Sequence, residues 1–242
     1  MNALILAAGT GSRLVHLTRD LPKALVEVKG RPLIDYALKW IECLRCEQIF
    51  VVGGFYFKKL EDFLSQYQGN LELIENKDFL KGSILTLTSA LPYLEDSFVL
   101  LNVDHIFPLR MAKRFLDLQP NLHEITAFVD FDRQLHEDDM KVKLDDAKKI
   151  QMISKGLHEF DAGYIGITYV PKEKLAIYKQ TAFELKAENE DAVVENVLQK
   201  LVEQREDLGI VNMVGVRWLE VDNQSDLKNA ERILRWVDNY LD

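Results

Sequence analysis

The chain opens with MNALILAAGTGSRL (residues 1–14), and LPKAL follows at residues 21–25. Residues 3–8 form a continuous apolar run bounded by Gly9, which is typical of a strand buried on both faces of a sheet. A turn containing Gly9 and Gly11 then leads to Ser12 and Arg13. Glycine permits positive φ and lets a ligand approach the backbone closely, so backbone amides can point at phosphate oxygens. The opening therefore predicts a buried strand followed by an anion-binding loop.

The rest of the first half alternates strand-like runs with amphipathic segments. Apolar residues recur at three- and four-residue spacing behind Pro32, which predicts a helix as far as Leu44. Alternation of this kind implies parallel strands with right-handed crossovers, and a ligand crevice beyond their carboxyl ends. We expect a doubly wound α/β sheet with strands at 49–52, 71–74 and 98–101 and helices at 56–67 and 83–91.

The pattern changes at about residue 123, where short strand candidates separated by charged turns suggest antiparallel strands added beside the first sheet. The expected fold is therefore mixed and mainly parallel, with a small antiparallel lobe. A last helix carries the apolar stripe Leu227, Ala230, Ile233, Leu234, Val237 and Leu241. Strands are expected at 124–131, 141–144, 150–153, 164–170, 209–214 and 217–221, and helices near 171–178 and 191–203.

Composition limits the class of protein. The 242 residues are 48% hydrophobic and 29% charged, as in an ordinary globular protein, and the net charge of −9 argues against a general nucleic-acid binder. A small anionic substrate stays compatible with this charge, because a local basic pocket can lie on an acidic protein. No apolar run approaches the roughly 20 residues of a membrane helix, and no signal peptide precedes the first strand. We expect a cytoplasmic protein without a membrane partner; the sequence leaves its oligomeric state open.

Cys43 and Cys46 form an isolated C-x-x-C. A zinc site needs two more ligands at recognisable spacing, and the five scattered histidines do not supply them. We expect a reduced, structural pair, although a redox role is the alternative for this spacing.

The glycine turn departs from two common nucleotide-binding motifs. Leu14 stands where the dinucleotide fingerprint requires its third glycine and where the Walker loop requires its second. What remains is L-A-A-G-x-G-[ST]-R-L followed by P-K-A-L, and this conjunction resembles the sugar-phosphate nucleotidyltransferase family. The resemblance extends over nearly the whole chain and implies attack of an acceptor phosphate on the α-phosphorus of a nucleoside triphosphate.

Each residue type at the amino-terminal end suits that chemistry, which depends mainly on positioning and on charge stabilisation. Arg13 can grip two phosphate oxygens with its planar guanidinium, and Lys23 offers a point charge to the α-phosphate. By resemblance, VVGGF (residues 51–55) helps to frame the base, and the segments at residues 75–76 and 82–85 close over it. Ser83 is also a candidate helix N-cap, alone or combined with a base contact. The expected nucleotide-binding residues are Leu6, Ala7, Ala8, Gly9, Thr10, Gly11, Ser12, Gly53, Gly54, Glu75, Asn76 and Ser83.

Two acids far apart in the chain are the expected metal ligands. Asp104 ends the apolar stretch LLNVD (residues 100–104), where the family has an acid that binds Mg²⁺. Val103 departs from the small residue usual before this acid. Asp222 closes WLEVD (residues 218–222), which matches a second family segment, although a turn or helix-cap role is its alternative. Two carboxylates suffice because Mg²⁺ is commonly completed by phosphates and water.

The acceptor side resembles inositol-1-phosphate cytidylyltransferases in the order and spacing of MKVK (140–143), ISKGL (153–157) and FDAGY (160–164). That resemblance implies that Lys141 binds and aligns the acceptor phosphate, while Asp161, Ala162 and Gly163 line the polyol pocket. It also divides the single domain into a nucleotide-binding half (1–122), an acceptor-binding half (123–222) and a C-terminal helix (223–242).

The sequence thus predicts a Mg²⁺-dependent reaction of CTP with inositol 1-phosphate, giving CDP-inositol and pyrophosphate. The alternatives within the class are a phosphocholine cytidylyltransferase, for which an aromatic cage would be diagnostic, and a hexose-1-phosphate enzyme using UTP, GTP or dTTP. Outside the class, a noncatalytic nucleotide-sensing module remains an alternative. An NAD-dependent oxidoreductase is disfavoured by Leu14.

Overall fold

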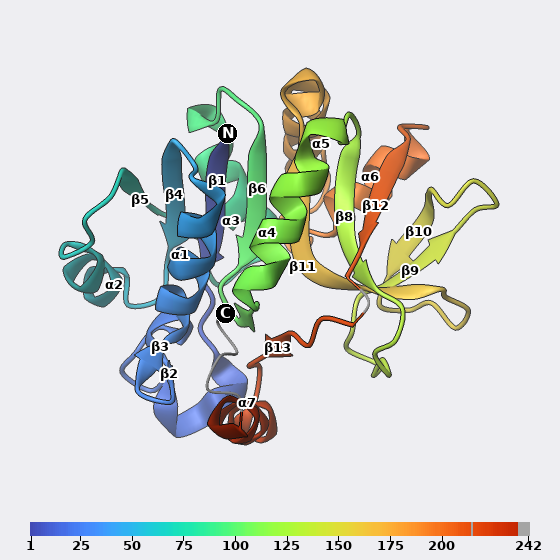
Figure 1. The fold of residues 1–242 in the computed structure, drawn as a ribbon. Helices are drawn as coiled ribbons and strands as arrows, with labels where there is room; N and C mark the ends of the chain where they lie inside the picture. The colour runs from blue at the N-terminus through green and yellow to red at the C-terminus, as the bar shows by residue number, and fades with distance from the viewer. Residues whose placement is uncertain (214, 237–242) are drawn as a thin grey trace.

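The computed structural model describes residues 1–213 and 215–236. Within these residues, nine strands form one sheet (Figure 1). The strands are β1 (Asn2–Ala7), β4 (Gln48–Gly53), β5 (Leu71–Glu75), β6 (Phe98–Asn102), β8 (Ile125–Asp130), β9 (Lys141–Leu144), β10 (Ile150–Ser154), β11 (Ala162–Val170) and β12 (Leu208–Asn212).

The order of this sheet confirms the mixed, doubly wound architecture. Its path runs β10-β9-β11-β6-β1-β4-β5, and β8 lies between β11 and β12. β1 pairs in parallel with β4 and β6, and β4 pairs in parallel with β5. β11 is antiparallel to β6, β8 and β9, so it joins the two halves of the chain into one sheet.

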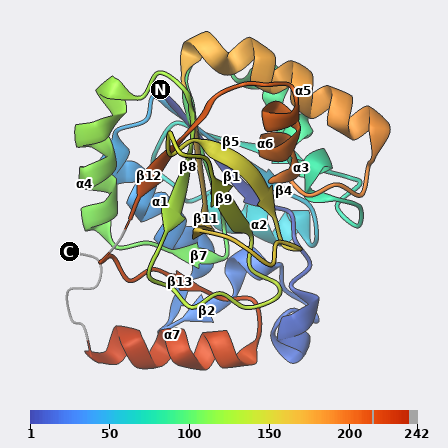
Figure 2. The ribbon, with the colours of Figure 1, turned by 90° about the vertical axis from the view of Figure 1, so that its right-hand side faces the viewer.

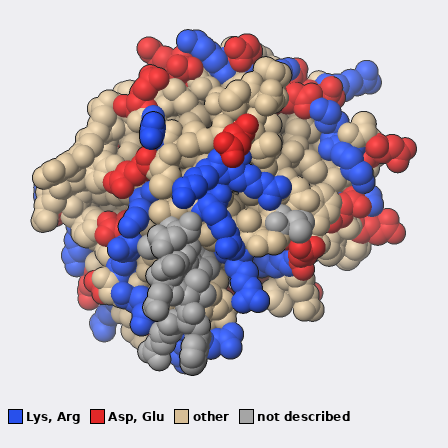
Figure 3. All heavy atoms as spheres, viewed as in Figure 1, with Lys and Arg blue, Asp and Glu red and all other residues tan. Residues whose placement is uncertain are grey.

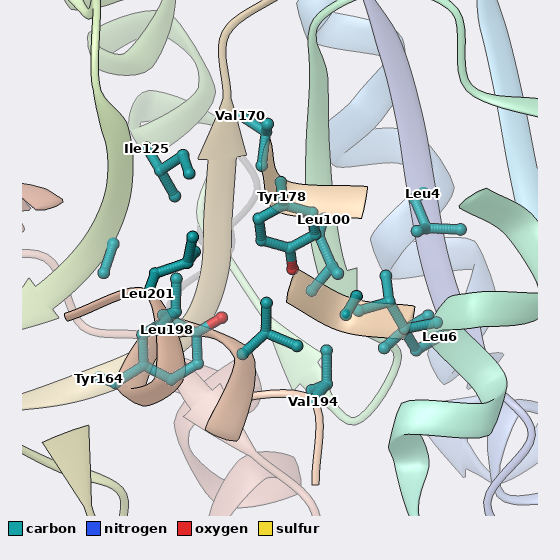
Figure 4. Packing of buried hydrophobic residues seen from close by; sticks show 14 of the residues in the cluster. Leu4, Leu6, Leu100, Ile125, Tyr164, Val170, Tyr178, Val194, Leu198 and Leu201 are labelled. Atoms are coloured by element: carbon teal, nitrogen blue, oxygen red, sulfur yellow. The ribbon is translucent and has the colours of Figure 1, made fainter. Parts of the chain in front are cut away.

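Alternate side chains of β1 face two different hydrophobic layers, as the two-residue period of a strand requires. Leu4 and Leu6 pack toward α3, α5 and α6 (Figure 4), whereas Ala3 and Ile5 pack toward α1, α2 and α4. Figure 2 shows α1 and α4 on one side of the sheet and α3, α5 and α6 on the other. The helices are α1 (Leu33–Leu44), α2 (Phe57–Leu64), α3 (Ser83–Ala90), α4 (Leu109–Leu118), α5 (Leu175–Glu188) and α6 (Asn196–Glu203).

The last helix, α7 (Gln224–Trp236), covers the opening loop of the chain. Its Ala230 packs in a cluster with Leu14 and Leu33, and Leu227, Ile233 and Leu234 pack against that cluster. Val237 and Leu241 of the predicted stripe lie outside the described residues. Two small antiparallel sheets lie nearby, β2 (Glu27–Val28) with β3 (Arg31–Pro32), and β7 (His105–Ile106) with β13 (Leu219–Glu220). Short 3₁₀ helices occupy Ser12–Leu17, Lys23–Leu25, Leu91–Tyr93, Gln119–Asn121 and Lys172–Lys174.

Three helices differ from the sequence-based expectation. Helix α4 was not predicted; it buries Met111, Ala112 and Phe115 while its outer face is charged. Figure 3 shows Lys and Arg side chains gathered over the middle of this face, where α4 lies. α5 begins at Leu175, because residues 172–174 form a 3₁₀ turn behind Pro171, and it continues to Glu188. α6 begins at Asn196 rather than at residue 191.

No helix in the described parts of the chain combines the length and the apolar character needed to cross a membrane.

Candidate active site

A cavity of about 370 Å³ opens at the carboxyl ends of β1 and β6, where the doubly wound topology predicts a ligand crevice. Both halves of the chain contribute to its wall. The sequence-predicted residues among its lining are Leu6, Ala8, Gly9, Gly11, Ser12, Arg13, Lys23, Ser83, Asp104 and Asp222.

Gly11 allows the opening loop to fold tightly against the segment that carries Lys23. Its φ is +63°, and a Cβ placed there would lie 2.8 Å from Thr18 Cγ2 and 3.1 Å from Lys23 Cβ. The Thr18 hydroxyl donates a 2.8 Å hydrogen bond to the Gly11 carbonyl. Only glycine fits this left-handed, crowded position, so the loop sequence and the placement of Lys23 depend on each other.

Lys23 joins the two acids that the sequence singled out. Its Nζ donates a 2.7 Å hydrogen bond to Asp104 Oδ2 and a second, very short one to Asp222 Oδ1. Arg13 reaches the other oxygen of Asp222 at 2.6 Å and lies 3.5 Å from Asp138. The convergence of Asp104 and Asp222 on one ammonium places residues from both ends of the chain at one point.

Burial and charge act in opposite directions on this cluster. Burial alone would raise the pKa of Asp104, but Lys23 and His105 outweigh it and hold that pKa well below its ordinary value. Burial alone would lower the pKa of Lys23, and the two carboxylates more than offset it, so the pKa is raised. Asp104 is therefore a carboxylate and Lys23 an ammonium at neutral pH.

His105 fixes the other side of Asp104. Its Nδ1 lies 2.7 Å from Asp104 Oδ1, and its ring stacks between Phe107 (centroids 5.6 Å apart) and Trp218 (5.3 Å). Burial alone would lower the pKa of His105, but the Asp104 carboxylate raises it. Trp218 is held in turn by a 2.9 Å hydrogen bond from its Nε1 to Asp130 Oδ2. The ring stack and the pairing of β7 with β13 thus hold the segment that leads to Asp222 against the segment that follows Asp104.

The donor set at this edge fits Mg²⁺, a hard cation that is commonly held by one or two carboxylates plus phosphates and water. Asp104 and Asp222 each have an oxygen within 2.7 Å of Lys23 Nζ, so both carboxylates face one small region beside the cavity. These are the two residues that would hold the ion.

Several predicted nucleotide-binding residues support the cavity from outside its lining. Gly54 lies so close to Ala8 and Phe79 that a Cβ would approach within 2.4 Å of Phe79 Cβ. The Asn76 side chain is buried and donates to Thr86 Oγ1 at 3.0 Å, and Thr86 itself lines the cavity. In the described chain, Ala7, Thr10, Gly53, Gly54, Glu75 and Asn76 do not belong to the lining, and Glu75 is exposed.

The prediction that Ser83 caps α3 is wrong. The N-cap position is Gly82, and no side chain caps the helix. The Ser83 hydroxyl instead accepts a 2.8 Å hydrogen bond from the Val194 N–H. Gly82 packs against the same loop so closely that a Cβ would lie 2.2 Å from the Ala192 carbonyl oxygen. Ser83 still lines the cavity, but it joins the first half of the chain to the loop before α6.

The residues predicted to bind the acceptor make contacts within the described part of the protein and lie outside the cavity lining. Lys141 Nζ donates to the backbone carbonyls of Glu137, Asp139 and Lys155, at 3.1, 3.4 and 2.8 Å. Asp161 accepts a 2.8 Å hydrogen bond from the Leu144 N–H. Ala162 is buried, and Gly163 packs closely against Leu135. The cavity lining, as far as the chain is described, includes none of Lys141, Asp161, Ala162 and Gly163.

Lys155, in contrast to Lys141, contributes to the cavity lining. It is exposed, and among the described residues its ammonium has no hydrogen-bond or ion-pair partner. Lys155 lies in the segment ISKGL (residues 153–157), which the sequence already indicates on the acceptor side. Which of the two lysines lines the cavity depends on how β9 pairs with β10, and the sequence alone does not show this pairing. Sequence reasoning also missed Asn102, Tyr164, Glu195, Trp218 and Glu220 as cavity-lining residues.

Cys43 and Cys46 are both free thiols at the end of α1, and Cys46 packs against the α1–α4 core cluster. Burial raises the pKa of Cys46 to about 12. In the described part of the chain, no group of three or more His, Cys, Asp or Glu side chains could hold a metal ion.

This fold and this site define a nucleotidyltransferase. A model of the MobA-like NTP transferase domain matches residues 3–204, and the chain belongs to that family. The predicted membership in a nucleotidyltransferase family is thereby confirmed.

Two curated proteins are similar over nearly the whole chain. The CTP:phosphoglutamine cytidylyltransferase of Campylobacter jejuni is 26% identical, covering 94% of this chain and 98% of that protein. The 2-aminoethylphosphonate cytidylyltransferase of Lancefieldella rimae is 28% identical, covering 93% and 90%. The solved structure of the inositol-1-phosphate CTP transferase from T. maritima has the same fold, with a TM-score of 0.78 at 23% identity and 96% coverage of both chains.

Proposed function

We propose that this protein transfers the CMP group of CTP to the phosphate of a small phosphorylated acceptor. An acceptor phosphate oxygen forms a bond to the α-phosphorus, the bond to the oxygen that leads to the β-phosphate breaks, and pyrophosphate leaves. The observation that carries the proposal is the convergence of Asp104 and Asp222 on Lys23 beside the glycine turn. Phosphoryl chemistry of this kind requires positioning and charge stabilisation more than covalent assistance.

The chain's own residues have distinct parts in this reaction. The loop amides and Arg13 bind the triphosphate, and Lys23 stabilises charge on the α-phosphate. Asp104 and Asp222 would hold Mg²⁺, which would supply positive charge that screens the repulsion between two anionic substrates. A phosphomonoester is already a nucleophile, so no general base is needed, and the free ammonium of Lys155 is placed to align it.

The acceptor predicted from the sequence is inositol 1-phosphate. Relatives similar over nearly the whole chain are named for phosphoglutamine and for 2-aminoethylphosphonate, both of which contain nitrogen as well as phosphorus. All three belong to one class, small phosphates or phosphonates with a polar group, and cytidine is common to the names of both curated relatives.

A matrix of CTP, UTP, GTP and dTTP against inositol 1-phosphate, phosphoethanolamine, 2-aminoethylphosphonate, phosphocholine and glucose 1-phosphate tests the proposal. Pyrophosphate release is measured with Mg²⁺ and with EDTA. We expect release with CTP and at least one acceptor, and its loss in EDTA. Release only with another triphosphate would overturn the cytidylyl assignment, and tight CTP binding without any release would favour the nucleotide-sensing alternative.

A further inference from the structure

Glu195 is a half-buried acid that lines the cavity, and neither the triphosphate nor the metal site provides a use for it. It is the N-cap residue of α6 and lines the same cavity as Lys155. Its Oε1 accepts a 3.2 Å hydrogen bond from Asn102 Nδ2, and Asn102 is the last residue of β6, two positions before Asp104. Within the described residues this is the single hydrogen bond that another side chain makes to Glu195, although a carboxylate can accept several.

The loop that carries Glu195 is held rigidly in place. The Val194 N–H donates to the Ser83 hydroxyl at 2.8 Å, and the Val193 N–H donates to Asn196 Oδ1 at 3.0 Å. Val194 belongs to the same buried hydrophobic cluster as Leu198 and Tyr164 (Figure 4). Because the loop backbone on the N-terminal side of Glu195 is held in place, the carboxylate cannot easily move away from a bound ligand. A ligand that offers it no hydrogen-bond donor should therefore bind less well than one that does.

Charged groups share the cavity wall with Glu195, among them Lys155 and Asp104. Burial raises the pKa of Glu195, although hydrogen bonds from its own backbone N–H and from Asn102, together with the Lys155 ammonium, act to lower it. The hydroxyl group of Tyr164 is already bonded to Thr168 at 2.9 Å. A carboxylate offers about four lone-pair sites, so Glu195 can still accept a hydrogen bond from a ligand beside those from Asn102 and its own N–H.

The aromatic side chains of the cavity do not form a cage for a quaternary ammonium. Trp218 is covered on its two faces, by the Arg133 guanidinium 3.9 Å from its centroid and by the His105 ring 5.3 Å away. Tyr164 is only 7% exposed. Recognition of a trimethylammonium group depends on free aromatic faces, which these two described rings do not offer.

We propose that Glu195 determines acceptor specificity by accepting a hydrogen bond from an N–H or O–H group of the acceptor, so that the acceptors are phosphorylated amines or polyols and not quaternary ammonium compounds. This inference rests on the proposed cytidylyl transfer. Lys155 then faces the acceptor phosphate while Glu195 faces the other end of the molecule. An amine and a polyol share this chemistry, and the test below separates them.

The test compares kcat/KM for inositol 1-phosphate, phosphoethanolamine and phosphocholine in wild type, Glu195→Gln, Glu195→Asp and Glu173→Gln. Glu173 is an exposed acid outside the cavity lining and serves as the matched control. We expect wild type to prefer an N–H or O–H acceptor over phosphocholine at least tenfold. Glu195→Gln should reduce this preference by about 10- to 100-fold, the effect of one hydrogen bond to a charged group. The KM for CTP should stay within about twofold, as it should in Glu173→Gln.

The two acceptor arms identify the source of the hydrogen bond. If Glu195→Gln lowers kcat/KM more for phosphoethanolamine than for inositol 1-phosphate, the donor to Glu195 is an ammonium group. If it lowers kcat/KM more for inositol 1-phosphate, the donor is a hydroxyl group. Glu195→Asp keeps the negative charge and should retain part of the preference for N–H or O–H acceptors over phosphocholine. It tests the same role of Glu195 if the Glu195→Gln protein folds poorly.

The role of Glu195 would be overturned by phosphocholine turnover equal to the other acceptors, or by an equal loss for all three in Glu195→Gln. These results leave the proposed function intact, because wild type still releases pyrophosphate. Absence of release from wild type with every acceptor would instead overturn the proposed function, and the acceptor role of Glu195 with it.

Discussion

At the residue scale, the site depends on where the charged groups of a few side chains lie. Lys23 can be placed from sequence because the turn before it admits only glycine at residue 11, so its position follows from a local pattern. Lys141 could not be placed in this way. Its ammonium is directed to three backbone carbonyls, one of them on Lys155, and their convergence is set by tertiary structure.

The two lysines should therefore respond differently to truncation. Lys155→Ala should raise the KM for the acceptor about tenfold or more while leaving the free energy of unfolding within about 0.5 kcal/mol, because its side chain is exposed and free. Lys141→Ala should lower the free energy of unfolding by about 1–3 kcal/mol, because the buried Lys141 side chain and its three hydrogen bonds to backbone carbonyls are lost. Steady-state kinetics and urea unfolding of both variants check this. The opposite assignment of the two effects would restore Lys141 to the acceptor site.

At the element scale, the strands were predictable and some helices were not. Buried strands such as β1 have continuous apolar runs that a sequence displays directly. Helix α4 has only a narrow buried stripe within a charged segment, and α6 begins late because residues 191–195 form the loop that contacts Ser83. Such contacts between distant segments override local propensity.

The 3₁₀ segment after the glycine turn contains a strained position. Val15 has φ 45° and ψ −96°, a conformation that a β-branched residue adopts only at a cost, and its side chain is 56% exposed. Val15→Gly should raise the free energy of unfolding by about 1 kcal/mol, because relief of strain exceeds the entropy that glycine adds to the unfolded chain. Urea unfolding measures the change, with Leu17→Gly, in the same segment, as the control that should destabilise. A Val15→Gly protein with a lower free energy of unfolding than wild type would contradict the claim that Val15 is strained.

At the scale of the whole molecule, the site exists only because the sheet joins two halves of the chain. β11 pairs with β6, and β13 pairs with β7, which brings the Asp222 segment beside Asp104. The family motifs named both acids in advance, but their distance could not be obtained from the sequence. Their shared partner Lys23 was not foreseen either, since its role was predicted only toward phosphate.

The ion pairs of Asp104 with Lys23 and His105 should make the free energy of unfolding fall as the pH is lowered. The folded-state pKa of Asp104 is lowered from 3.8, so its stabilising contribution is complete above that value and is lost as the pH falls through it. From pH 5 to pH 3, the difference in unfolding free energy between wild type and Asp104→Asn should shrink by about 1 kcal/mol. Urea unfolding at both pH values checks this, and a difference independent of pH would contradict it.

The central claim is that two acids far apart in the sequence, Asp104 and Asp222, serve one divalent cation and one nucleotide. Electron paramagnetic resonance of Mn²⁺ titrated into the protein with CTP measures this directly, independently of turnover. We predict that Asp104→Asn and Asp222→Asn each weaken Mn²⁺ binding at least tenfold, whereas Asp138→Asn, outside the pair, changes it little. Wild-type Mn²⁺ affinity in either of the first two variants would contradict the account.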